Sequence, residues 1–194
     1  MKPFVLLDNG HGSDTRGKCS PDGRYYEWEW TRRAAGAIRE RLLRDGIDCH
    51  LLVPEDTDVP LAERCRRSMA PANLYPDAIL VSLHSNASTM GYDWGRASGW
   101  SAWVSHNASE RSRRLASLLT DEARRRSLLG NRATPPEGYC TANYAICRDT
   151  PCPAVLTENM FHDNRDDVDF LLSDEGTGII ADLHVAAIKE YYGL

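Results

Sequence analysis

The amino-acid sequence predicts a single α/β domain with a mostly parallel sheet flanked by helices. Short aliphatic runs alternate along the chain with longer segments of helical periodicity, which is typical of helices packed on parallel strands. The 194 residues, 42% of them hydrophobic and 26% charged, suffice for one hydrophobic core. The stretches 71–76 and 130–138 contain proline or glycine but are short enough to be loops rather than linkers between domains.

Each element is predicted from its local pattern. Short runs of aliphatic or β-branched residues predict strands at 4–7, 49–53, 78–83, 100–104, 144–147 and 154–157. Longer segments with apolar residues at helical spacing predict helices at about 27–44, 61–69, 109–126 and 179–192. The many arginines of the segment 109–126 are interpreted as a solvated outer face of its helix.

Composition and charge exclude several classes of protein. A net charge of -5 argues against a general nucleic-acid binder, which usually carries a basic excess. The N-terminus has one lysine and only four apolar residues before Asp8, so we expect no signal peptide and synthesis in the cytoplasm. No stretch is apolar enough for stable membrane insertion. The six cysteines lack C-x-x-C spacing and are interpreted as reduced thiols, although Cys140 could pair with Cys147 or Cys152 outside the cell.

Two histidines are predicted to lie at the same edge of the sheet. His11 follows the first strand in the motif Asp8-Asn-Gly-His-Gly, whose glycines permit a sharp turn. His84 directly follows the apolar run 78–83. Because the carboxyl ends of parallel strands meet at one edge, we expect the two imidazoles to lie close together. Taken alone, each would more often be a surface or structural histidine than a metal ligand.

Two glutamates are predicted to reach the same edge. Glu27 opens a helix on the face that carries Trp30 and Ile38, which should pack against the sheet. Glu29 is rotated by about 200° from it and should be solvated. Glu158 follows the strand 154–157, and a buried carboxylate there needs a metal, a cation or hydrogen bonds. The alternatives are a first-turn acid favoured by the helix dipole at Glu27 and a salt bridge to an arginine at Glu158.

This set of side chains predicts an open hydrolytic metal site. Two imidazoles and one carboxylate suit zinc, and the remaining carboxylate suits a general base. His162 lies four residues after Glu158 and could reach the site to orient a substrate. The polar segment 85–99 follows a strand and is the candidate substrate-facing loop. The remaining histidines are not expected to be ligands: His50, His106 and His184.

The motifs around these residues, taken in order, resemble one family: the zinc-dependent N-acetylmuramoyl-L-alanine amidases, cell-wall hydrolases of bacteria and their phages. The matching stretches are 5–14, 26–27, 61–64, 77–87 with its Ser-Leu-His-Ser-Asn core, and 153–161 followed by Asn164. The resemblance implies that His11, Glu27 and His84 bind Zn²⁺ and that Glu158 is the catalytic glutamate. It also implies a twisted, mostly parallel sheet of about six strands.

The resemblance extends to substrate and location. It implies a peptidoglycan substrate, with Asn86 and His162 as candidate substrate-binding residues, and action at the cell wall or periplasm. The chain lacks the long regulatory helix of division-associated amidases and a separate wall-binding module, so it resembles a minimal catalytic domain, as in phage or prophage lysins, and we expect a monomer. Two departures are Asn9, where the family usually has proline, and the pair Asn159-Met160.

The expected reaction is hydrolysis of the muramoyl-alanine amide, with Glu158 taking a proton from water and returning it to the leaving amine. The same groups would suit a zinc peptidase or a deacylase acting on another amide. A third hypothesis is a peptidoglycan-binding domain that keeps the fold without the chemistry. The basic face of the helix at 109–126 could in addition attract an anionic cell-wall surface.

Overall fold

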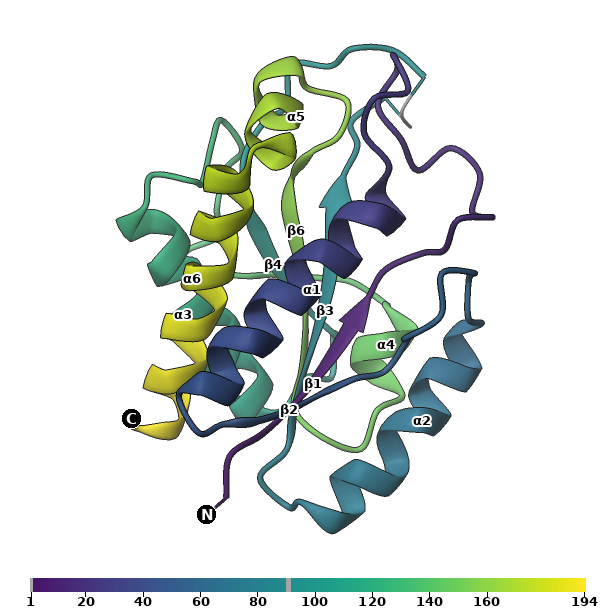
Figure 1. Cartoon of the computed structure of the whole chain (residues 1–194). Coiled ribbons are helices and arrows are strands. Elements are labelled where there is room, and N and C mark those ends of the chain that lie inside the picture. Colours follow the sequence, from purple (N-terminus) through teal and green to yellow (C-terminus); the bar gives the residue numbers. More distant parts are fainter. Residues whose placement is uncertain (1, 90–91) are drawn as a thin grey trace.

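A computed structural model describes residues 2–89 and 92–194 and confirms the predicted α/β fold. Its strands form one sheet in the order β2-β1-β3-β6-β4-β5, in which the neighbours are parallel except β4 and β6, which are antiparallel. The strands and helices of the described residues (Figure 1) are β1 Phe4–Asn9, α1 Glu27–Arg44, β2 Asp48–Leu51, α2 Leu61–Leu74, β3 Ile79–Asn86, β4 Ser101–Val104, α3 Glu110–Arg125, β5 Cys140–Thr141, α4 Ala145–Arg148, β6 Ala154–Phe161, α5 Arg165–Leu172 and α6 Asp174–Tyr192.

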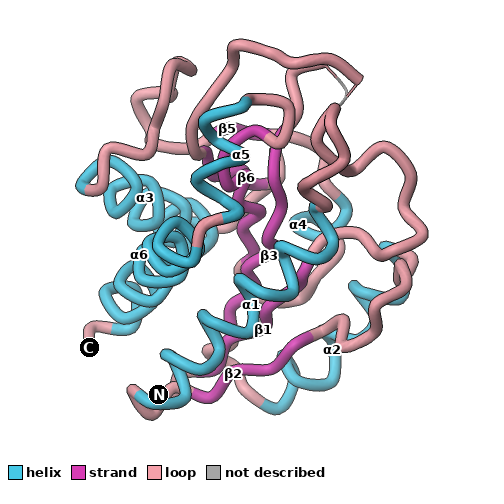
Figure 2. Tube along the Cα trace, turned by 45° about the horizontal axis from the view of Figure 1, so that its top comes forward, coloured by secondary structure: helices cyan, strands magenta, loops and turns pink. Residues whose placement is uncertain are grey.

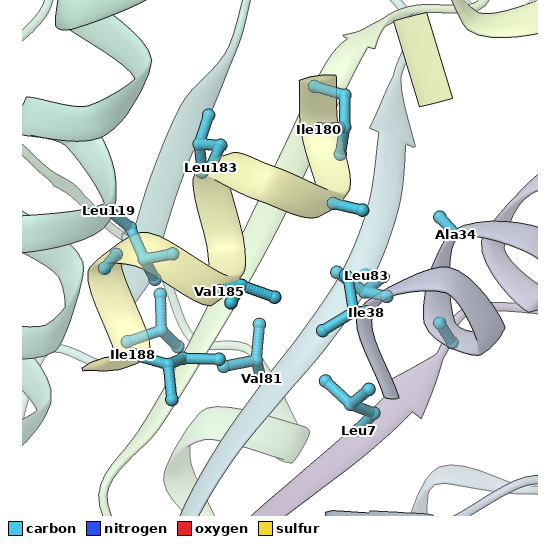
Figure 3. Packing of buried hydrophobic residues seen from close by; sticks show 14 of the residues in the cluster. Leu7, Ala34, Ile38, Val81, Leu83, Leu119, Ile180, Leu183, Val185 and Ile188 are labelled. Carbon is cyan, nitrogen blue, oxygen red and sulfur yellow. The ribbon is translucent and has the colours of Figure 1, made fainter. Parts of the chain in front are cut away.

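Helices cover both faces of the sheet. On one face, side chains of α1, α3 and α6 form the larger core with Leu7 and Val81, and Figure 3 shows Ile38 and Ile188 turned toward these strand residues. On the other face, α2 and α4 pack against a smaller core that includes Leu6. Because successive residues of a strand point to opposite faces, β1 contributes to both cores and is buried along its length.

Local signals set the helix phase and ends. In α1 the predicted stripe of Trp30, Ala34 and Ile38 is buried with Glu27, whereas Glu29 is exposed, as the helical phase predicts. The side chains of Ser109, Asn164 and Ser173 accept backbone hydrogen bonds and cap the starts of α3, α5 and α6. These contacts fix how the helices sit on the sheet.

The structure differs from the sequence prediction in several elements. Residues 144–147, predicted as a strand, form the helical turn α4, because backbone N–H groups such as that of Asp149 bond to carbonyls three or four residues back. The strand β5 and the helix α5 were not predicted. They have only two and eight residues, too few to show a clear hydrophobic period in the sequence. Helix α2 continues through Pro71, whose φ suits a helix and whose missing N–H removes only one bond.

The strands that carry the predicted site are also longer than expected. β3 runs to Asn86 and β6 to Phe161, so His84 and Glu158 lie inside strands rather than directly after them. The carboxyl ends of β1, β3 and β6 meet at one edge, which loops surround (Figure 2). Positions 90 and 91 of the predicted substrate-facing loop 85–99 lie outside the described residues. Among the described helices, none has the length and apolarity needed to cross a membrane.

Candidate metal centre

Three of the predicted residues bring a potential metal ligand to one point at this edge. One ligand atom each from His11, Glu27 and His84 lies within 4.8 Å of the other two. Oε1 of Glu27 lies 3.5 Å from Nε2 of His11 and 3.0 Å from Nδ1 of His84. The loop after β1, the first turn of α1 and strand β3 thus place two imidazoles and one carboxylate together. We call these three residues the ligand cluster.

Two arginines hold the loop that carries His11. The φ of His11 is +62°, a left-handed conformation that a non-glycine residue keeps only when its surroundings hold it there. Its carbonyl oxygen accepts hydrogen bonds from Arg32 at 3.2 Å and from Arg64 at 3.3 Å. Arg64 is buried and also pairs with the buried Asp8 at 2.8 Å, whose other oxygen accepts a bond from Ser82. A polar network beneath the cluster therefore fixes the backbone of His11.

The glycines on either side of His11 allow close approach. A Cβ atom on Gly10 would lie 2.3 Å from the ring of His84, and one on Gly12 would lie 1.9 Å from the backbone nitrogen of Asp58. Neither position can carry a side chain unless its neighbours move. Burial lowers the pKa of His11 to about 4, against the opposing charge of Glu27. The imidazole is therefore neutral at pH 7, which is the form that binds metals.

Glu27 is a fully buried carboxylate at the start of α1. Its Oε1 accepts a hydrogen bond from the backbone N–H of Ser85 at 3.0 Å, while its Oε2 is buried with no hydrogen-bond partner among the described residues. Burial favours the protonated form, but the hydrogen bond with His84 and the charges of the nearby histidines outweigh it and lower the pKa of Glu27 to about 2. The side chain is therefore ionised and keeps one oxygen available.

Glu158 lies next to the cluster because the register of β3 and β6 pairs it with His84. Burial, with a smaller contribution from the charge of Glu27, raises its pKa to about 7. Burial would lower the pKa of His84, but its hydrogen bond to Glu27 and the surrounding carboxylates raise it overall. One oxygen of Glu158 is buried without a hydrogen-bond partner in the described part of the chain. Glu158 can therefore exchange a proton near neutral pH.

The side chains of Asn9 and Asn159, which depart from the family pattern, donate hydrogen bonds to backbone carbonyls around the site. The register shifts just after the His84 and Glu158 pair, and Met160 in this irregular stretch has a φ of +67°. The side-chain amide of Asn159 donates to the carbonyl of His84 at 3.0 Å. That of Asn9 donates to Val53 at 3.0 Å. All three side chains are buried.

His162 lies behind Glu27. It was expected at the open edge, but its side chain is only 1% exposed. Its Nδ1 is 3.0 Å from the hydroxyl of Ser85 and 3.8 Å from Oε2 of Glu27. The hydroxyl of Tyr25 donates to the same serine at 2.9 Å, and its ring stacks on that of His162. Sequence reasoning singled out neither Tyr25 nor Ser85, since no motif marks a side chain that touches a ligand only through another residue.

The other predicted positions lie outside the cluster. Asn86 ends β3 half-buried, with Oδ1 accepting the backbone N–H of Ala87. His50 and His106 are exposed, and His184 is buried in α6 between Thr157 and the Ile180 carbonyl. The cysteines are free thiols in this structure, including the three considered for a disulfide. The exposed arginines of α3 form the predicted outer face: Arg111, Arg114, Arg124 and Arg125.

Comparisons with known proteins agree with this fold. The family described as N-acetylmuramoyl-L-alanine amidase matches residues 5–190. An endolysin of Bacillus phage SPP1 is 28% identical over 196 residues, covering 100% of this chain and 68% of that protein. The probable cell wall amidase LytH of Staphylococcus aureus is 27% identical over 190 residues, 97% of this chain and 58% of that protein.

Solved structures show the same fold. The catalytic domain of CwlV from Bacillus (Paenibacillus) polymyxa superposes with a TM-score of 0.82 at 22% identity, covering 100% of this chain and 99% of that one. An N-acetylmuramoyl-L-alanine amidase from Clostridium difficile 630 gives a TM-score of 0.85 at 22% identity, covering 99% and 97%. At these identities the likeness concerns the fold, and the roles of individual residues depend on their geometry.

Proposed function

The chain belongs to the N-acetylmuramoyl-L-alanine amidase family, and from this premise we propose that it hydrolyses the amide between the lactyl group of N-acetylmuramic acid and L-alanine in peptidoglycan. In this proposal residues 1–194 act as one catalytic domain, the ligand cluster holds zinc, and Glu158 transfers protons. The observation that carries the proposal is the meeting of three candidate ligands beside a buried glutamate with a pKa near 7.

The geometry of the cluster fits zinc. Ligand atoms about 2.0–2.2 Å from a tetrahedral zinc ion lie roughly 3.3–3.6 Å from one another. Oε1 of Glu27 lies 3.5 Å and 3.0 Å from the two imidazole nitrogens, close to that spacing. The donor set also suits zinc, because two imidazoles and one ionised, fully buried carboxylate are common zinc ligands. Bound zinc supplies polarisation of the scissile carbonyl and acidification of a water molecule.

Glu158 is the proposed proton carrier. A general base works best when its pKa lies near the working pH, and burial raises that of Glu158 to about 7. Its carboxylate takes the proton of the attacking water and returns it to the nitrogen of L-alanine as the amide bond breaks. Because Glu158 is paired with His84 in the sheet, its distance from the cluster is set by the register of two strands rather than by a loop.

His162 and Asn86 have different proposed roles. Because His162 is buried beside Glu27, we assign it to positioning that carboxylate through Ser85. Asn86 lies at the open end of β3 and stays the candidate substrate contact. The named relatives, an endolysin and a probable cell wall amidase, support action at the cell wall, including the role of a phage lysin, although the chain spans 58% of the length of LytH.

Product analysis of digested cell walls tests the reaction. The wild-type protein should release new amino termini of L-alanine from purified peptidoglycan, and Glu158→Gln should release none while it still binds about one zinc per chain. Glu27→Gln should lose the zinc, whereas Glu29→Gln, a matched change at an exposed position of the same helix, should keep both zinc and activity.

Four other outcomes would contradict the proposal. Cuts inside the stem peptide would indicate a zinc peptidase, and new reducing ends of the glycan would indicate a glycosidase. Bound zinc without cleavage of any wall would indicate a peptidoglycan-binding domain. Full activity of Glu158→Gln would remove the assigned proton carrier.

A further inference from the structure

A hollow with a volume of about 220 Å³ lies beside the ligand cluster. It is lined by residues 13–19 and by Tyr26 and Trp28. Its wall is continuous with the cluster, because the backbone N–H of Glu27 donates to the carbonyl of Lys18 at 2.9 Å and the next residue, Cys19, forms an antiparallel bridge with Tyr26. The wall of the hollow is therefore joined directly to the start of α1, where Glu27 lies.

The hollow has basic side chains without ion-pair partners. Within the described ranges, neither Arg16 nor Lys18 lies within salt-bridge distance of a carboxylate. The one acidic residue of the lining, Asp14, accepts a hydrogen bond from the backbone of Asp58. The backbone of Lys18 is tied to the site, since its carbonyl accepts the hydrogen bond from the N–H of Glu27. Lys18 is thus a half-buried cation in the wall of the hollow, one hydrogen bond away from the backbone of Glu27.

The proposed substrate has a sugar arm and a peptide arm, one on each side of the scissile amide. Their chemistry determines which arm the Lys18 cation can bind. In the amide that is cleaved, the carboxyl group of muramic acid is already consumed, so the sugar arm offers no carboxylate there. The peptide arm offers one on the residue after L-alanine. A carboxylate that leaves water on binding needs a cation or hydrogen-bond donors facing it, and Lys18 supplies such a cation in the wall of the hollow. The aromatic rings of Tyr26 and Trp28 provide apolar surface for the rest of the peptide.

We propose that this hollow is the subsite for the peptide arm of the substrate, in which Lys18 pairs with the carboxylate of the residue that follows L-alanine. This assignment rests on the proposed amidase function. It makes Lys18 a specificity-determining residue: substrates with a free carboxylate at that position are preferred over substrates with a carboxamide there.

A matched pair of substrates tests the subsite. One is N-acetylmuramoyl-L-alanyl-γ-D-glutamyl-L-lysine, and the other carries D-isoglutamine in place of D-glutamate, so that the two differ only in a carboxylate and a carboxamide. The wild-type protein should favour the carboxylate by roughly tenfold in kcat/KM, chiefly through KM. Lys18→Gln should remove most of this preference, and Lys18→Arg should retain it. Lys189→Gln is the control. Lys189 lies on α6 and pairs with Asp45 at the end of α1, so this change should keep the wild-type preference.

Binding of the product peptides separates this inference from the proposed reaction. L-alanyl-γ-D-glutamyl-L-lysine should bind the zinc-loaded wild-type protein more tightly than its isoglutamine analogue in calorimetric titration, and Lys18→Gln should equalise the two. If the wild-type protein cleaves neither substrate but shows this difference in binding, the reaction is wrong and the subsite stands. Equal binding of the two peptides by the wild-type protein, or an unchanged preference in Lys18→Gln, would overturn the subsite.

Discussion

Replacing Arg64 with methionine should strongly destabilise the protein and loosen the loop that carries His11. Arg64 is 3% exposed, and its guanidinium pairs with Asp8 at 2.8 Å while donating to the carbonyls of Asn9 and His11. Removal of one partner of a buried ion pair costs about 3–5 kcal/mol, because the other charge stays buried. Ser82 still donates to Asp8 in the variant, so we expect the lower half of that range.

Urea unfolding measures this effect. The midpoint should fall with the slope unchanged, as expected for a pure loss of stability. The double variant Asp8→Asn, Arg64→Met should recover part of the loss because no charge then remains buried. Arg66→Met is the matched control on the same helix: Arg66 pairs with Glu63 in an exposed position, so this change should cost far less stability than Arg64→Met. Equal costs for the Arg64 and Arg66 variants, or no recovery in the double variant, would refute the reasoning.

Three further predictions concern titration and steric fit. Burial lowers the pKa of His184 from 6.5 to about 4, so the unfolded chain binds more protons between these values and stability should fall as pH drops from 6.5 to 4. The free energy of unfolding should fall by about 3 kcal/mol at most over this range. In urea unfolding at several pH values, the free energy of unfolding of a His184→Gln variant should depend less on pH than that of the wild type; the same dependence in both proteins would contradict this. Gly12→Ala should weaken zinc binding in a chelator competition, since its Cβ would lie 1.9 Å from the backbone nitrogen of Asp58. Gly36→Ala is the control, because there is open space around that position, and it should bind zinc as the wild type does. Equal zinc affinities of the two variants would count against the steric argument. Hydrolysis should fall below about pH 7 as Glu158, whose pKa is raised to about 7, becomes protonated, and a rate independent of pH from 5 to 8 would exclude it as the base.

The sequence predicted those parts of the site that depend on periodicity and strand order. Helical phase separated the buried Glu27 from the exposed Glu29, and the strand runs predicted His84 and Glu158 at one edge of one sheet, where the structure pairs them in adjacent strands. These features are local, and each depends only on a repeat of 3.6 or 2 residues and on the common edge of parallel strands.

The contacts that complete the site could not be predicted in this way. The hydrogen bond from Arg64 to the carbonyl of His11 joins residues that are 53 positions apart in the sequence, and the hydrogen bond from Tyr25 to Ser85 joins residues that are 60 positions apart. Such contacts depend on how α2 and the loop after β1 pack in three dimensions. His162 was expected to reach the open edge because it follows Glu158 by four residues, but its side chain is buried beside Glu27.

The same reasoning explains the errors in secondary structure. A run of four apolar or aromatic residues, such as 144–147, is compatible with a strand or with a helical turn, and the choice depends on the tertiary contacts that bury Ile146. The sequence also did not indicate which contacts Asn159 and Asn9 make. Each side chain donates a hydrogen bond to a backbone carbonyl of a neighbouring segment, that of His84 and that of Val53 respectively.

The most direct measurement is anomalous X-ray scattering at the zinc absorption edge, collected from crystals of the purified protein. The account predicts one strong peak bounded by the imidazoles of His11 and His84 and the carboxylate of Glu27, and the loss of that peak in Glu27→Gln but not in Glu29→Gln. A peak at any other position, or no peak from protein incubated with zinc, would contradict the assignment of these three residues as the metal ligands.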